Sequence, residues 1–194
     1  MVPDVELFDS RCQGAGSMSA ITTDQVFELL SQSRAGRVTK ENLQKFLLNP
    51  DGGTGYTVVV NFGKTVEEMV ASGRYDWSND NFTSKNFSVN GTDVAVALEL
   101  VHLNKVISSE DVLRHLEENG MRPTTVEEFL SFGATYPEIQ REFPVLCLGS
   151  SWVFPDGDRR VPCLLRGGSD RGLGLCWFGG GWLEDCRFLA VRKS

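Results

Sequence analysis

From residue 56 onward, hydrophobic positions alternate between the period of two that is typical of strands and the period near 3.6 that is typical of helices. Short β-branched runs predict strands, and capped amphipathic runs predict helices. The elements expected before residue 134 are a strand at 57–62, a helix at 65–71 closed by Gly73, a strand at 94–101, a helix between Ser108 and Asn119-Gly120, and a helix at 124–133. Residues 75–93 predict an ordered loop with a hairpin end at Asn90-Gly91.

The last fifty residues are strand-like and are interrupted by glycine and proline. Strands are expected at 143–149, 160–165, 171–177 and 186–192. Helices and short strands in this order predict an α+β domain.

Residues 1–54 differ from the rest and predict two short amphipathic helices. A helix-turn-helix module is one interpretation, but the second helix offers only Lys40 and Lys45 in an acidic region. A small packing or assembly element is therefore favoured. We divide the chain into a small helical N-terminal element (1–54) and a larger domain (55–194).

The composition suits one folded domain, because 194 residues with 41% hydrophobic side chains can bury a core. No apolar stretch is long enough to span a bilayer, and the acidic amino terminus does not resemble a signal peptide. We therefore expect a cytoplasmic protein, with display on a cell or virion surface left open. The net charge of −7 argues against nucleic acid or a membrane as partner.

The charge is unevenly distributed. Residues 145–194 carry seven Lys and Arg against five acids, a net charge of +2, whereas the preceding residues carry −9. This asymmetry indicates two regions with different roles.

The five cysteines form no Cys-x-x-Cys pair, which disfavours zinc-ribbon and thioredoxin-like sites. Buried reduced thiols are the favoured interpretation. One structural disulfide among the last four cysteines, or a metal or redox role, stays open. The cysteines are Cys12, Cys147, Cys163, Cys176 and Cys186.

Evidence for catalysis is thin. His102 and His115 are the only histidines, and neither neighbours a motif. The chain has no nucleophile elbow, zinc-binding helix motif, phosphate loop or dinucleotide fingerprint. We expect no catalytic residue, no metal and no cofactor.

The unusual feature is glycine at the carboxyl end, where seven of the chain's 20 glycines lie between residues 167 and 181. In strand 171–177, Gly172, Gly174 and Cys176 share one face and Leu173, Leu175 and Trp177 share the other. Two explanations compete. The glycines allow close backbone approach, or their face has no packing role and is free to present side chains to a ligand.

The run from Arg159 to Leu164, the Leu-x-Leu-x-Trp-Phe pattern of 173–178, Trp182 and the terminal 187–192 strand resemble the variable proteins of diversity-generating retroelements. The resemblance covers about residues 55–194, and its specific part is 160–194. It implies a C-type-lectin-like fold with two helices and a short-stranded antiparallel sheet, related to formylglycine-generating enzymes. In that family, a reverse transcriptase rewrites template adenines, and the altered residues lie on a rigid ligand-binding face.

Carried over to this sequence, the resemblance implies variable, ligand-binding positions between rigid ones. Glycine, Asp, Cys and Leu are reachable from an AAC codon by changing adenines, whereas Glu184 is not. The variable positions are Asp170, Gly172, Gly174, Cys176, Gly179, Gly180, Gly181, Leu183, Glu184, Asp185 and Cys186. The scaffold positions are Trp177, Phe178, Trp182 and Phe188.

The expected function is therefore non-catalytic, receptor-type binding of a protein or other macromolecule through a diversified surface. A calcium-held sugar is not expected, because the Glu-Pro-Asn type tripeptide is absent. One alternative is a copper- or thiol-dependent oxidase of the formylglycine-generating type, with Cys176 and Cys186 as metal ligands. The other is a structural or assembly protein.

Overall fold

The structure is a computed structural model that describes residues 55–193. The N-terminal helical element expected at 1–54, with its helix-turn-helix alternative, lies outside these residues. In chain order the described elements are β1 (Gly55–Val60), α3 (Val66–Gly73), β2 (Trp77–Ser78), β3 (Val94–His102), β4 (Ile107–Ser108), α4 (Ser109–Glu118), β5 (Met121–Pro123), α5 (Val126–Thr135), α6 (Ile139–Glu142), β6 (Val145–Leu146), β7 (Trp152–Val153), β8 (Arg159–Gly167), β9 (Asp170–Trp177), β10 (Gly181–Trp182) and β11 (Arg187–Arg192).

The α+β class is confirmed, but the sheet is larger than expected. Within residues 55–193, nine strands form one sheet in the order β1-β3-β11-β6-β8-β9-β2, with β5 pairing with β11 and β7 with β8. Most pairs are antiparallel, and the β11–β6 and β2–β9 pairs are parallel. The described part contains four helices, whereas the resemblance implies two. The hydrophobic pattern predicts α3, α4 and α5, and the short α6 is the helix that it did not predict.

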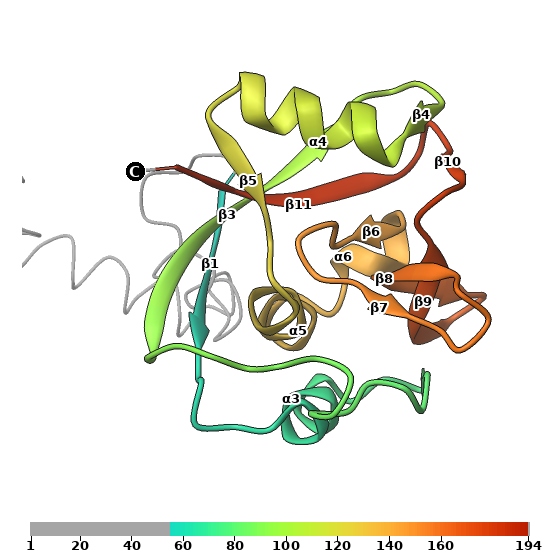
Figure 1. The fold of residues 1–194 in the computed structure, drawn as a ribbon. Helices are drawn as coiled ribbons and strands as arrows, with labels where there is room; N and C mark the ends of the chain where they lie inside the picture. Colours follow the sequence, from blue (N-terminus) through green and yellow to red (C-terminus); the bar gives the residue numbers. More distant parts are fainter. Residues whose placement is uncertain (1–54, 194) are drawn as a thin grey trace, which may run out of the picture. The chain divides into compact units, whose positions relative to one another are not determined.

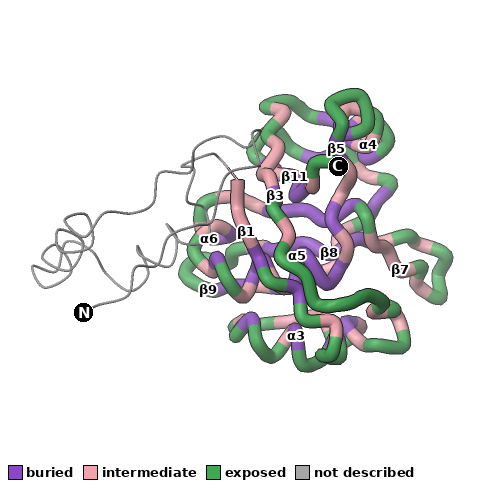
Figure 2. The backbone as a smooth tube through the Cα atoms, turned by 90° about the vertical axis from the view of Figure 1, so that its left-hand side faces the viewer, coloured by how far each residue is buried: buried purple, intermediate pink, exposed green. Residues whose placement is uncertain are grey.

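Helices cover both faces of the sheet (Figure 1), with α4 on one side of β11 and with α5 and α3 on the other. One core cluster joins α3 and α5 to the sheet through residues such as Phe129, Phe132 and Leu189. A second cluster joins α4 to the opposite face through Leu116, Trp182 and Phe188. The buried backbone runs through α5, β8 and β11 (Figure 2).

The predicted helices begin at the expected caps. Thr65 and Glu68 form a capping box at α3, in which the Thr65 hydroxyl accepts from the Glu68 amide and Glu68 accepts from the Thr65 amide. Ser108 caps α4 by accepting from the Asp111 amide. Local sequence thus fixes the point where each helix starts.

A buried arginine in β9 ties helices α3 and α5 to the sheet. Arg171 of β9 is 5% exposed, and its guanidinium donates to the carbonyls of Gly73 (2.8 Å) and Gly133 (2.8 Å). These carbonyls lie in the last turns of α3 and α5, where a cation is favourable. Burial lowers the pKa of Arg171.

The hairpin expected at Asn90-Gly91 is absent from the described residues. Strand β3 pairs with β1, and the chain between them contains α3 and β2, so Asn90-Gly91 lies in an irregular segment. Stacking of Phe82 on Phe87, with ring centroids 5.5 Å apart, orders the loop.

The cysteine prediction is wrong for one pair. Cys163 of β8 and Cys176 of β9 form a disulfide, so the alternative of one structural disulfide is the observed one. Cys147 and Cys186 are free and buried, as the favoured interpretation had it, and Cys12 lies outside the described residues. Burial raises the pKa of Cys147 to about 12.

Among residues 55–193, no helix combines the length and apolar character that crossing a membrane requires.

Candidate functional site

The candidate site is built around residues 178–186, which connect β9 to β11 and which we call the anchored loop. Every fourth side chain points into the protein: Phe178 is 7% exposed, Trp182 7% and Cys186 8%. Between these three anchors lie two accessible tripeptides. They are Gly179-Gly180-Gly181, of which Gly180 is half-buried, and Leu183-Glu184-Asp185, which is exposed throughout.

One buried hydroxyl holds the anchored loop against α4. Ser109, the first residue of α4, is fully buried and accepts a hydrogen bond from Trp182 Nε1 at 2.9 Å. The same hydroxyl donates to the Phe178 carbonyl at 2.6 Å. Strands β10 and β4 pair beside it, with Trp182 opposite Ile107. Trp182 also meets the Phe188 ring edge-on, with centroids 6.4 Å apart.

The backbone of the second tripeptide is fixed, and its side chains are exposed. His102 Nε2 donates to the Glu184 carbonyl at 2.8 Å, and Arg187 donates to the Asp185 carbonyl at 2.7 Å. Leu183 is 64% exposed. The side chains at 183–185 can therefore change without altering these contacts.

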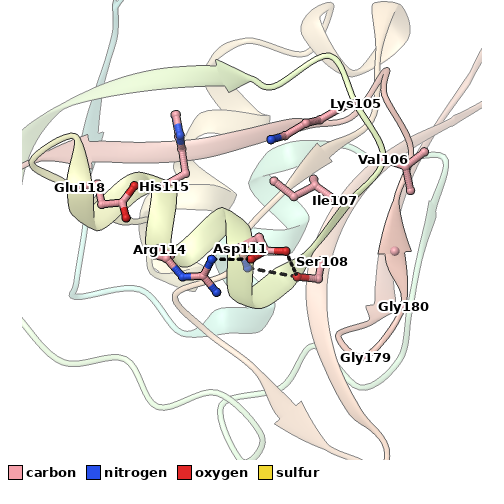
Figure 3. A pocket seen from close by; sticks show the side chains of 11 residues that line it. Lys105, Val106, Ile107, Ser108, Asp111, Arg114, His115, Glu118, Gly179 and Gly180 are labelled. Atoms are coloured by element: carbon pink, nitrogen blue, oxygen red, sulfur yellow. Dashed lines mark hydrogen bonds and ion pairs between the residues drawn. The ribbon is translucent and has the colours of Figure 1, made fainter.

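A groove of about 590 Å³ opens between the anchored loop and α4, and we call it the α4 groove. Its glycine wall is Gly179–Gly181, its floor includes Ile107 and Ser108, and its other wall is one face of α4. Figure 3 shows these residues, which come from two segments of the chain, 105–118 and 179–181. The lining residues are Lys105, Val106, Ile107, Ser108, Asp111, Arg114, His115, Glu118, Gly179, Gly180 and Gly181.

The middle of the α4 groove contains an ion pair, in which Arg114 lies 2.8 Å from Asp111. The Ser108 hydroxyl donates to the same carboxylate at 2.8 Å. This hydrogen bond, with the charges of Arg114 and Lys105, lowers the pKa of Asp111. Asp111 is therefore a partnered carboxylate at neutral pH, unsuited to be a general acid or base.

Exposure divides the expected variable positions into two groups. Gly179, Gly181, Leu183, Glu184 and Asp185 are exposed and Gly180 is half-buried, so the structure brings these six together on the anchored loop.

Three expected positions are not available to a ligand. Gly174 and Cys186 are buried, and Cys176 is half-buried and bonded to Cys163. The prediction that these three positions present side chains to a ligand is therefore wrong. Asp170 is exposed, but it begins β9, roughly 23 Å along the strand from Trp177 at its other end.

Close approach explains Gly174 of β9, whereas a Cβ at Gly172 would make an ordinary contact. Trp77 of β2 pairs with Gly172 and lies over this face, so that a Cβ at Gly172 would be 3.5 Å from the Trp77 ring. A Cβ at Gly174 would be 3.2 Å from both Cys163 Sγ and Leu165 Cδ1. The first of the two explanations therefore applies to Gly174. Gly180 and Gly181 have room for a side chain, and a side chain at Gly179 would require the Trp177 ring to shift.

Three of the four expected scaffold residues, Phe178, Trp182 and Phe188, are buried. Trp177 is 56% exposed and is not an internal anchor. Its ring lies beside Gly179, where a Cβ would approach Cζ2 at 2.9 Å. Alternation puts Trp177 on the same face as Leu173 and Leu175. Trp177 is the last residue of β9, where this face is no longer covered, so its side chain is exposed.

Sequence reasoning missed the α4 wall. Asp111, Arg114, His115 and Glu118 recur with helical spacing and line the groove together. The signal was present as a polar face on the helix after Ser108, but such faces are usually only solvated. Nothing local indicated that the glycine tripeptide would lie opposite.

The copper site considered for the oxidase is not formed. Cys176 is oxidised to a disulfide, so it offers no thiolate to pair with Cys186. Burial raises the pKa of Cys186, which keeps it a neutral thiol. Residues 55–193 contain no group of three or more His, Cys, Asp or Glu residues placed to hold a metal ion.

Comparison with known proteins finds no matching family model, curated protein or solved structure.

Proposed function

We propose that this chain is a non-catalytic, receptor-type binding protein that presents changeable side chains on the anchored loop to a protein or other macromolecular ligand. The observation that carries the proposal is the alternation along residues 178–186. Buried anchors recur at every fourth position, and accessible tripeptides fill the intervals. Substitutions at exposed positions away from core packing typically change stability by no more than roughly 0.5 kcal/mol.

The glycine tripeptide can accept side chains. A Cβ at Gly181 would meet only Val106 Cγ1, at 3.6 Å, and a Cβ at Gly180 would be 3.4 Å from the Trp177 ring. Neither glycine has the left-handed φ that would strain an L-residue. Trp177 is itself exposed, so its ring can yield to a side chain at Gly179.

We further propose that the domain is a variant of the C-type-lectin fold and the target of retroelement mutagenesis. Support comes from the segment where the sequence resemblance is most specific, because it contains the anchored loop and the buried strands on both sides of it. Seven of the eleven positions expected to vary lie on this loop, and six of them are accessible, since Cys186 is buried.

A structural role remains the second candidate, and one observation favours it. Trp77 packs on the glycine face of β9, so part of the glycine-rich end has a packing function. This role and display are separable, because they involve different segments.

The binding proposal is tested by randomising the six loop positions, 179–181 and 183–185, in the full chain displayed on yeast, with hen lysozyme as the probe. We expect most variants to reach the surface folded, and selection to yield lysozyme binders that compete with one another for one site. A matched library randomised at Gly172, Gly174 and Cys176 should lose surface expression. A folded loop library without binders would overturn the proposal.

The retroelement proposal has its own test, which is to sequence the DNA that follows the gene. We expect a reverse-transcriptase gene and a near-copy of the 3′ coding end that differs at adenines of codons 179–185. A downstream region without such a copy would overturn this part and leave the binding proposal in place.

A further inference from the structure

Trp177, the last residue of β9, is an exposed tryptophan whose side chain has no polar or aromatic partner. It is 56% exposed, and within residues 55–193 it makes no ring contact, cation–π contact or side-chain hydrogen bond. Trp182 is the opposite case, because it is buried and donates its indole N–H to Ser109. The Trp177 ring and its N–H donor are therefore both available to a ligand.

The aromatic and cationic side chains beside Trp177 are already engaged. Arg160 of β8 pairs with Trp177 and with Trp152 of β7, so the three side chains share one face of the sheet. Trp152 packs on Phe154 with ring centroids 4.1 Å apart, and the Arg160 guanidinium lies 4.1 Å from the centre of the same Phe154 ring. Trp177 thus differs from its neighbours on this face in having no such partner within the described residues.

The Trp177 ring lies against the glycine tripeptide of the anchored loop. A Cβ at Gly179 would be 2.9 Å from Trp177 Cζ2, and a Cβ at Gly180 would be 3.4 Å from Trp177 Cε3. These two atoms are on opposite sides of the six-membered ring, so the ring extends beside both glycines. Trp177 is not among the residues that line the α4 groove, so the ring belongs to the surface of the loop outside the groove.

The main chain at Trp177 is held in place on both sides. Trp177 pairs with Arg160 in the β8–β9 ladder, and the amide of the buried Phe178 donates to a β8 carbonyl at 2.9 Å. The disulfide between Cys163 and Cys176 links the same two strands at the residue before Trp177. A large aromatic side chain on a rigid backbone gives contact area at a low cost in conformational entropy, and tryptophan is enriched among the residues that dominate protein–protein affinity.

We propose that Trp177 is a constant contact residue of the binding surface. Its ring contacts each protein ligand that the anchored loop binds, and the two tripeptides decide which ligand that is. In this chain the first tripeptide consists of glycine alone, so the side-chain contact beside it comes from Trp177. The ligand places an apolar group on the ring and an oxygen acceptor at the indole N–H. This inference rests on the proposed binding function and adds to it a residue that was expected to belong to the scaffold.

The test uses lysozyme binders selected from the loop library, each in the full chain. Trp177→Ala should weaken lysozyme binding at least about tenfold in most independent binders, because the ring and the N–H donor are both lost. Trp177→Phe keeps an aromatic ring without the donor, so its affinity should lie between those of the parent binder and Trp177→Ala.

The matched control is Trp77→Ala. Trp77 is 55% exposed, but it pairs with Gly172, which is five residues and roughly 17 Å along β9 from Trp177. Its replacement should change the affinity for lysozyme by no more than about twofold. Titration of the displayed variants with lysozyme, restricted to cells that carry folded protein, gives these affinities.

Hydroxyl-radical footprinting measures the same contact with both tryptophans intact, so it does not depend on the folding of the variants. Bound lysozyme should protect Trp177 from oxidation and leave the oxidation of Trp77 unchanged. Equal losses of affinity in Trp177→Ala and Trp77→Ala, or a Trp177 that lysozyme does not protect, would overturn the inference and leave the proposed function standing. A folded loop library without any binder would overturn both.

Discussion

Asparagine should destabilise the fold at Gly174 but not at Gly181, although both positions were expected to vary. At Gly174, a Cβ would lie 3.2 Å from Cys163 Sγ, and that sulfur cannot move away because it is bonded to Cys176. Overpacking of this kind costs about 1–3 kcal/mol, and a buried amide without a partner costs about 1–3 kcal/mol more. We expect Gly174→Asn to lower the free energy of unfolding by at least about 2 kcal/mol.

At Gly181 the same side chain enters open space. The nearest group is the exposed Val106 at 3.6 Å, an ordinary contact. Loss of a glycine also restricts the unfolded chain, which favours folding by about 0.4–1 kcal/mol. We expect Gly181→Asn to remain within about 0.5 kcal/mol of the wild type.

Urea denaturation followed by tryptophan fluorescence measures both changes. For a chain of this size, the difference corresponds to a loss of roughly 4–8 °C in Tm at Gly174 and almost none at Gly181. Comparable destabilisation by the two variants would refute the division between packed and presented glycines.

Three further changes test the supports of the site. Ser109→Ala strands the Trp182 N–H and should destabilise by about 1–3 kcal/mol in urea, with a shift of tryptophan emission; unchanged emission would contradict the anchoring role. Arg171→Met leaves the carbonyls of Gly73 and Gly133 without their donor and should lower the free energy of unfolding by about 2–4 kcal/mol in the same assay. Unchanged stability would contradict the role of Arg171 in joining α3 and α5 to the sheet. Burial raises the pKa of Cys147 from 9.0 to about 12, so its contribution to stability is complete below pH 9 and declines by about 1.4 kcal/mol per pH unit above it. The free energy of unfolding of Cys147→Ala should therefore fall less steeply than that of the wild type between about pH 9 and 10.5. Parallel pH dependences of the two proteins would disprove this.

Local signals predicted most of the helices and strands because capping and alternation act over a few residues. Thr65 and Ser108 start helices where the sequence indicates, and β8 and β9 form a hairpin from the strands expected at 160–165 and 171–177. The size of the sheet could not be predicted, because it depends on pairs such as β11 with β6 that join distant segments.

The candidate site was predicted only in part, because local patterns do not show which distant segments pack together. Alternation in β9 correctly placed Gly172, Gly174 and Cys176 on one face, but it could not reveal that Trp77 lies over that face. The anchors Phe178 and Trp182 were recognisable as large aromatic residues among glycines. Their partner Ser109 lies about seventy residues earlier, and no local pattern connects it to them.

The central claim is that the side chains at 179–181 and 183–185 have no packing role, whereas those of Phe178, Trp182 and Cys186 hold the backbone in place. A saturation-mutagenesis scan of residues 178–186, scored by folded display on yeast, tests it most directly. We predict a period of four in the scores, with substitutions rejected at the three anchors and accepted at the six positions between them. Broad rejection across the two tripeptides, or free substitution of Trp182, would contradict the account.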